Sequence, residues 1–223
     1  DQQDGSDRKV WEGNPVNWVA RFEQEGGEDE AIERGGDKRF ALDRVLAGEW
    51  GGGIDRARIV AAGHSYGANT TLMSAGARVV RQGRAIQLRD PRIRAAIVIP
   101  APPFYGDDDF RPILSGITIP TLHVTTADDI IRIPGFGSGV DDRLKVFDAT
   151  GGTHKVLAVH RHGTHNVFTD HRYFDSRVVS EDVKRATESL SLAFFDGTFE
   201  GSPVELAQWR ASHRALLARY ETR

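Results

Sequence analysis

The chain has 223 residues, 39% of them hydrophobic and 27% charged, which is enough to bury the core of one domain. Its 29 Lys and Arg residues nearly balance 32 Asp and Glu residues, whereas nucleic-acid-binding domains carry a clustered basic excess. The absence of cysteine excludes disulfides, Cys-ligated zinc sites and a cysteine nucleophile. The longest largely apolar stretch, residues 95–105, contains three prolines and is too short to span a bilayer.

The first predicted elements are helical. Asn14 and Pro15 open a short helix that extends to Glu23 and is followed by two glycines. A Gly-Gly-Asp loop at residues 35–37 then precedes a second helix over residues 38–50, where apolar residues recur at helical spacing. The three glycines at positions 51–53 end this helix.

Four short apolar runs are typical of buried parallel strands, and they cover residues 57–62, 95–99, 119–125 and 155–159. Three further stretches are predicted to be helical: residues 68–80, 180–195 and 203–220. Strands that alternate with helices indicate an α/β fold with a mainly parallel sheet. In such sheets the functional side chains gather on loops at the carboxyl ends of the strands.

The first run leads into Gly63-His64-Ser65-Tyr66-Gly67, which matches the G-x-S-x-G nucleophile elbow. In this sharp strand-to-helix turn the serine backbone is strained, and its neighbours two positions away, here Gly63 and Gly67, must be small. The motif also arises by chance in a Gly-rich chain, and an ordinary Gly-rich turn is the alternative. The apolar strand before it and the helix after it favour Ser65 as a nucleophile.

A serine hydroxyl needs a base to take its proton, and the base needs a carboxylate to fix its tautomer. Asp128 and Asp129 follow the third apolar run, and His165 follows the fourth, which provides both groups at strand ends. We expect His165 to be the base and Asp128 to orient it, with Asp129 facing solvent or capping the loop. Adjacent acids at a strand end also serve as simple helix caps.

Three histidines after the fourth run allow a different chemistry. His160, His162 and His165 form H-x-H-x-x-H, and imidazoles at this spacing are compatible with a zinc-dependent hydrolase. The dinuclear metallohydrolase pattern expects Asp before the last histidine, where this chain has Thr164. The metal site is therefore the second hypothesis. The acidic run at residues 107–109 is interpreted as a solvated loop.

Several other side chains are candidates for a substrate pocket. Ile131 and Phe136 lie just beyond the paired acids, in a segment that either lines a pocket or packs under a loop. His64 precedes the predicted nucleophile, and Tyr105 follows Pro102 and Pro103. These four residues are expected to flank the same cleft.

Taken together, these residues resemble the α/β-hydrolase superfamily, and most closely its bacterial dienelactone-hydrolase-like and platelet-activating-factor-acetylhydrolase-like esterases. The resemblance covers most of residues 35–200 and is most specific in the elbow and in the Gly-Thr-His-x-x-Phe-Thr-Asp stretch at residues 163–170. It implies one catalytic domain: a serine esterase with the triad Ser65, Asp128 and His165, which needs no cofactor. It also implies a small-molecule ester substrate and the Tyr66 N–H as one oxyanion donor. A non-catalytic binding protein on a hydrolase fold is the third hypothesis.

The chain departs from that family in one respect. In the family the nucleophile follows the fifth strand, and a loop after the third strand donates the other half of the oxyanion hole. Here a single strand is predicted before Ser65, so we expect the first four strands to be absent from residues 1–223. We expect an N-terminal segment of the same protein to complete the sheet. Similar bacterial esterases often have removed leaders, which favours a secreted or periplasmic location.

Overall fold

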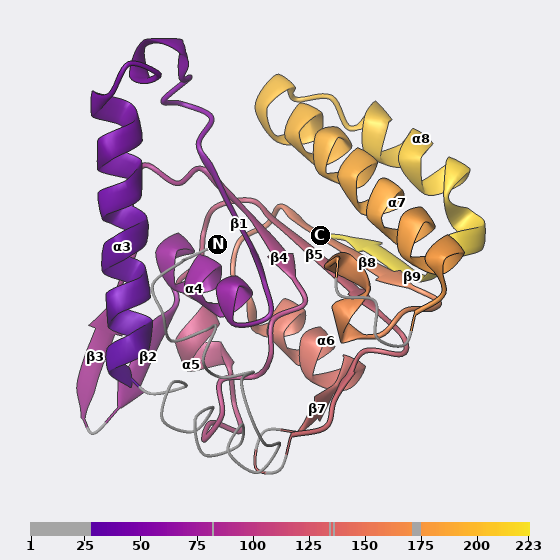
Figure 1. The fold of residues 1–223 in the computed structure, drawn as a ribbon, viewed down its shortest axis with the longest axis horizontal. Helices are drawn as coiled ribbons and strands as arrows, with labels where there is room; N and C mark the ends of the chain where they lie inside the picture. Colours follow the sequence, from indigo (N-terminus) through magenta and orange to yellow (C-terminus); the bar gives the residue numbers. More distant parts are fainter. Residues whose placement is uncertain (1–27, 82, 134, 136, 171–174) are drawn as a thin grey trace.

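The computed structural model describes residues 28–81, 83–133, 135, 137–170 and 175–223. At its centre is a five-stranded sheet with the order β1-β4-β5-β8-β9, in which the first four strands are parallel and β9 is antiparallel to β8. Helices α3 to α6 lie on one face and α7 and α8 on the other (Figure 1). The prediction of an α/β fold with a mainly parallel sheet is therefore confirmed.

The strands of the central sheet are β1 (Val60–His64), β4 (Ala95–Ile99), β5 (Thr121–Thr126), β8 (Lys155–His160) and β9 (Leu217–Thr222). Two antiparallel pairs flank it: β2 (Arg78–Arg81) with β3 (Arg84–Gln87), and β6 (Ile130–Ile131) with β7 (Ser138–Gly139). The helices are α3 (Glu28–Ala47), α4 (Tyr66–Ala75), α5 (Arg111–Leu114), α6 (Val140–Ala149), α7 (Arg177–Phe195) and α8 (Val204–Ser212). Shorter helical turns are η1 (Gly51–Gly53), η2 (His165–Phe168), η3 (Asp196–Glu200) and η4 (Arg214–Leu216).

Four predicted helix boundaries are wrong. The helix predicted to reach residue 50 ends at Ala47. The predicted loop at residues 35–37 lies inside α3, where a Cβ on Gly35 would come within 2.5 Å of the Leu88 side chain. Close packing of α3 against Leu88 thus explains a glycine in mid-helix. The helix predicted to reach residue 80 ends at Ala75, because Gly76 adopts a φ of 132°. Residues 217–220, predicted to be helical, belong to β9. The helix predicted over residues 14–23 lies outside the described residues.

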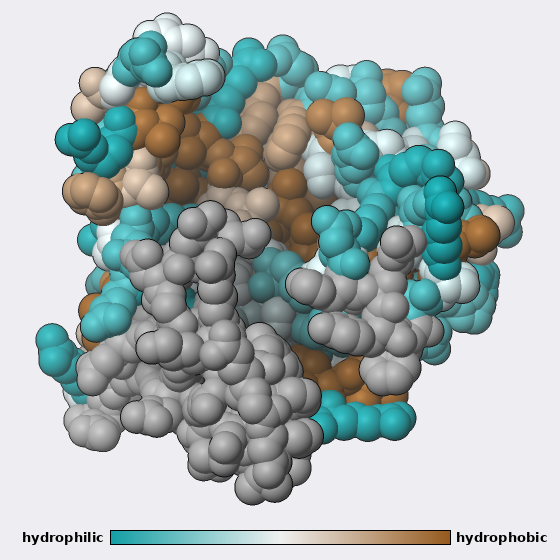
Figure 2. All heavy atoms as spheres, viewed as in Figure 1, coloured by the Kyte–Doolittle hydropathy of each residue, from teal (hydrophilic) through white to brown (hydrophobic). Residues whose placement is uncertain are grey.

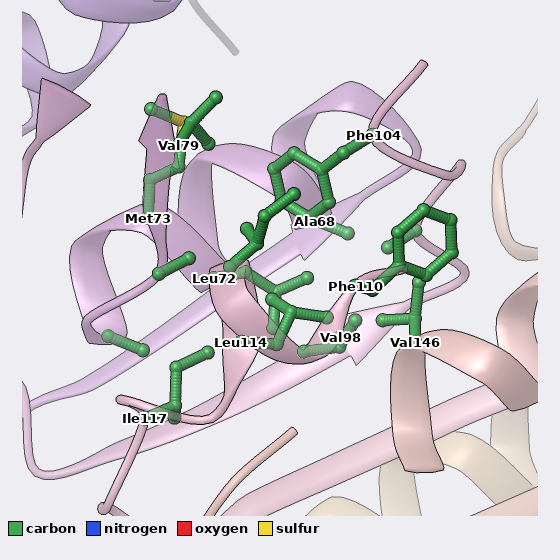
Figure 3. Packing of buried hydrophobic residues seen from close by; sticks show 14 of the residues in the cluster. Ala68, Leu72, Met73, Val79, Val98, Phe104, Phe110, Leu114, Ile117 and Val146 are labelled. Carbon is green, nitrogen blue, oxygen red and sulfur yellow. The ribbon is translucent and has the colours of Figure 1, made fainter. Parts of the chain in front are cut away.

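Two hydrophobic clusters hold the helices to the sheet. Residues of α4, α5 and α6 pack on one face, where Leu72, Leu114 and Val146 surround Val98 of β4 (Figure 3). On the other face, Leu190 and Phe194 of α7 pack against the sheet. Each of these side chains is at most 2% exposed, so the two clusters fix the strand ends from which the site loops emerge.

Strand β1 forms one edge of the central sheet in the described part of the chain. Ile59 C=O accepts a hydrogen bond from Arg94 N–H, and Ser65 N–H donates to Ile99 C=O, so both residues face β4. Because the backbone groups of successive residues point to opposite sides of a strand, those of Val60, Ala62 and His64 face the edge that no described strand pairs with. Hydrophobic residues gather over the first half of β1, between α3 and α7 (Figure 2). None of the helices in the described ranges has the length and apolarity that crossing a membrane requires.

Candidate active site

Ser65 occupies the turn between β1 and α4. Its φ of 55° and ψ of −125° make it the sole non-glycine residue with positive φ among those described. Its N–H donates to Ile99 C=O of β4, and its C=O accepts from Ala68 N–H, both at 2.8 Å. These bonds hold a backbone conformation that costs about 1–3 kcal/mol, which is characteristic of a nucleophile elbow.

The two glycines of the motif differ in their packing. A Cβ on Gly63 would collide with the backbone carbonyl of Gly67 and lie 2.7 Å from Thr71 Oγ1. A Cβ on Gly67 would meet no described atom within 4 Å. The prediction that both positions must be small therefore holds for Gly63, while the described surroundings of Gly67 leave room for a side chain.

A continuous hydrogen-bonded relay joins Ser65 to an aspartate. His165 Nε2 lies 2.9 Å from Ser65 Oγ, and His165 Nδ1 lies 2.8 Å from Asp129 Oδ1. Because a carboxylate only accepts, Nδ1 carries the proton and Nε2 presents its lone pair to the serine hydroxyl. This tautomer is the one in which a histidine can take the proton of Ser65.

The prediction that Asp128 orients His165 is wrong, because Asp129 holds that position. Asp129 is fully buried beneath the histidine. The side chain of Asp128 is 56% exposed and lies 3.3 Å from Nδ1 of His162, which is itself exposed. The turn that follows β5 thus directs the second acid inward and the first one outward, a choice that the Thr-Ala-Asp-Asp pattern leaves open.

Arg143 of α6 completes the surroundings of Asp129. Arg143 Nε donates to Oδ2 at 3.0 Å, Nη2 donates to Oδ1 at 3.3 Å, and Thr125 Oγ1 donates to Oδ2 at 2.8 Å. Burial by itself raises the pKa of Asp129, but the hydrogen bond from His165 and the Arg143 charge outweigh it and bring that pKa to about 2. Asp129 is therefore ionised across the pH range in which the protein would work.

His64 braces the loop that carries His165. Its Nε2 lies 2.9 Å from the backbone carbonyl of His165, and since a carbonyl only accepts, this nitrogen donates. The two imidazole centroids are 4.9 Å apart. Burial, followed by the nearby His165, lowers the pKa of His64 to about 4, so this side chain is neutral at neutral pH. His64 thus helps to fix the backbone position of His165.

Further bonds fix the loops after β5 and β8. Thr126 Oγ1 donates to Gly163 C=O at 2.5 Å, and Ala127 N–H donates to His160 C=O at 2.8 Å. Asp175 accepts from both the N–H and the hydroxyl of Thr164, at 2.7 and 2.6 Å. The carboxylate and the histidine therefore stand on loops that are tied to each other.

The three histidines of the H-x-H-x-x-H pattern do not converge. His160 is completely buried, with Nε2 3.3 Å from Thr187 Oγ1, while His162 is exposed and bonded to Asp128. His165 belongs to the relay. Across the described parts of the chain, no three His, Cys, Asp or Glu side chains form a group that could hold a metal ion. The geometry therefore does not favour the metal-site hypothesis.

The structure describes some of the residues predicted to line a substrate pocket. Tyr105 is half-buried, with its hydroxyl 3.5 Å from Ser138 Oγ, and Ser138 in turn accepts from Arg143 Nη1 at 3.0 Å. Ile131 is half-buried in β6 and pairs with Ser138 of β7. Tyr105 thus connects to the relay through two side chains. Phe136 lies outside the described residues.

Sequence reasoning missed Arg143, Ser138 and Asp175. For Arg143 a signal existed, because it shares the helical period of Val146 and Phe147, both of which are buried. A charged residue at a core position of an amphipathic helix indicates a buried partner. Ser138 and Asp175 have no comparable signal in the pattern.

Neither the protein-family models nor the curated proteins contain a match to this chain. The arrangement of the site itself therefore provides the argument for function.

Proposed function

We propose that this protein is a serine hydrolase that cleaves a carboxylic ester through an acyl-enzyme, on an α/β-hydrolase fold. The observation that carries the proposal is the relay from Ser65 Oγ through His165 to Asp129, with bonds of 2.9 and 2.8 Å. Its three members follow β1, β8 and β5, all parallel strands of one sheet. The elbow conformation of Ser65 gives independent support.

In the proposed reaction, Ser65 Oγ attacks the acyl carbon while His165 Nε2 takes the hydroxyl proton. The tetrahedral intermediate then loses its alcohol, which leaves with that proton. Water attacks the acyl-enzyme in the same manner, with His165 again as base, and releases the acid and free Ser65. Asp129 stays ionised throughout and stabilises the imidazolium.

The backbone N–H of Tyr66 is the proposed oxyanion donor. Tyr66 directly follows Ser65 and begins α4, so its N–H belongs to the first turn, where backbone donors point out of the helix end. A donor in this position typically contributes about 10²- to 10³-fold to turnover. The proposed chemistry needs no cofactor.

The test is turnover of p-nitrophenyl acetate and butyrate by the Ser65→Ala variant. We expect activity to fall by at least about 10⁴-fold with an unchanged circular dichroism spectrum. Ser212→Ala is the matched control, because it removes an exposed hydroxyl from α8 and should keep full activity. Retained turnover in Ser65→Ala contradicts the proposal. An inactive wild-type chain that still binds an ester favours the binding-protein hypothesis.

We also propose that a further N-terminal segment of the same protein pairs with the edge of β1 that bonds to no other strand among the described residues. The outward backbone groups of β1 and the hydrophobic residues beside them support this, because a strand edge next to apolar surface invites pairing. Mass spectrometry of active material from the natural source should detect that segment. Folded, active material that consists of residues 1–223 alone would contradict it.

A further inference from the structure

We infer that Arg143 is a positioning residue of the relay, which fixes the Asp129 carboxylate against His165. This inference rests on the proposed function. Arg143 acts through Asp129, with which it forms a buried ion pair. Both side chains are at most 3% exposed.

The geometry of the pair fixes the carboxylate in two directions. Arg143 Nε donates to Asp129 Oδ2 at 3.0 Å and Nη2 donates to Oδ1 at 3.3 Å. This is the two-pronged arrangement, or fork, in which a guanidinium binds both oxygens of a carboxylate. Oδ1 also accepts from His165, and Oδ2 also accepts from Thr125. The carboxylate plane therefore has no freedom to turn away from the histidine. A lysine ammonium cannot reproduce this fork.

The fork itself is anchored at the other end. Arg143 Nη1 donates to Ser138 Oγ at 3.0 Å, and α6 begins at Val140, where the Gly139 N–H donates to Asp142 at 3.0 Å. Arg143 thus joins α6 and β7 to the loop that carries Asp129. A buried ion pair adds little net stability compared with an apolar replacement. Stability alone therefore does not account for the buried pair of Arg143 and Asp129.

The experiment compares kcat and KM, with p-nitrophenyl acetate at one pH, for wild type, Arg143→Gln, Arg143→Lys and Lys145→Gln. Arg143→Gln and Arg143→Lys both lose the fork on Asp129, so kcat should fall about 10-fold in each at constant KM. Lys145→Gln removes an exposed charge from the same helix and should match wild type.

The outcomes separate the inference from the function it rests on. An active wild type together with native kcat in Arg143→Lys overturns the inference and leaves the proposed function intact. If Arg143→Gln does not fold, the kcat of Arg143→Lys still decides. If neither variant folds, Arg143 is assigned to stability alone and the inference fails. An inactive wild type overturns both proposals.

Discussion

The orientation of Asp129 depends on which way a two-residue acidic turn faces. Asp129 points into the protein and accepts from four donors of His165, Arg143 and Thr125, while Asp128 points into solvent. The two acids are chemically equivalent and adjacent in sequence. They therefore form a natural pair of variants for testing which carboxylate supports the histidine.

Asp129→Asn should lower kcat by about 10³- to 10⁴-fold, because an amide can stabilise the wrong imidazole tautomer and carries no charge. Asp128→Asn should retain activity within about twofold, since it breaks only an exposed contact to His162. Ester hydrolysis at pH 7.5 measures both. Equal losses in the two variants would contradict the assignment of Asp129.

The two elbow glycines provide a second matched pair. Gly63→Ala should reduce the free energy of unfolding by about 2–3 kcal/mol, because its Cβ overlaps the backbone of Gly67. Gly67→Ala should lie within about 0.5 kcal/mol of wild type, since the described surroundings leave space for a methyl group. Urea unfolding compares them. A similar stability for both variants would show that β1 and α4 are less closely packed than described.

At the level of elements, the loop that carries His165 is held by contacts from outside itself. Asp175, just before α7, accepts two hydrogen bonds from Thr164, and His64 of β1 donates to the carbonyl of His165. The base is thus positioned both by β1 and by the residue that lies two positions before α7.

Asp175→Ala should lower kcat about 10- to 100-fold with little change in KM, because the histidine loop loses its anchor. Asp170→Asn is the control, since that carboxylate is fully exposed and pairs with Lys184. Steady-state kinetics with p-nitrophenyl butyrate measures both. Native kcat in Asp175→Ala would show that the remaining bonds are sufficient to hold the loop.

The elements that the sequence predicts best are those with the clearest local pattern. The run at 95–99 matches β4, and the other three apolar runs overlap β1, β5 and β8, because buried parallel strands need continuous apolar residues. Ser65 and His165 also lie together as expected, since both follow such strands. The C-terminal strand β9 was missed because its polar, antiparallel edge has no such run. The inward direction of Asp129 depends on tertiary contacts that local patterns do not encode. The helical period around Arg143 marks a core position but does not identify Asp129 as its partner.

At the level of the whole molecule, buried histidines make stability depend on pH. Burial lowers the pKa of His64 and His160 to about 4 and that of His123 to about 3. In the unfolded chain these groups titrate near pH 6.5, so the unfolded state binds more protons below that pH. Stability is therefore fully present above pH 6.5 and is lost as the pH falls toward 4.

The free energy of unfolding should fall by about 2–4 kcal/mol between pH 7.5 and pH 5.5. This window lies above the titration of ordinary carboxylates, so the histidines dominate it. His160→Asn should flatten the slope, because His160 is buried outside the proposed relay. Urea titrations at several pH values measure the slope. A pH-independent free energy across this window would contradict the neutral, buried state of these imidazoles.

The central claim is that the relay activates Ser65 as a nucleophile. Intact-protein mass spectrometry after incubation with a fluorophosphonate probe tests it most directly, because the probe reacts only with an activated serine. We expect a single adduct that maps to Ser65, forms in step with the loss of ester hydrolysis, and is absent from Ser65→Ala. A wild-type protein that is folded yet remains unmodified, or is modified at another residue, would contradict the claim.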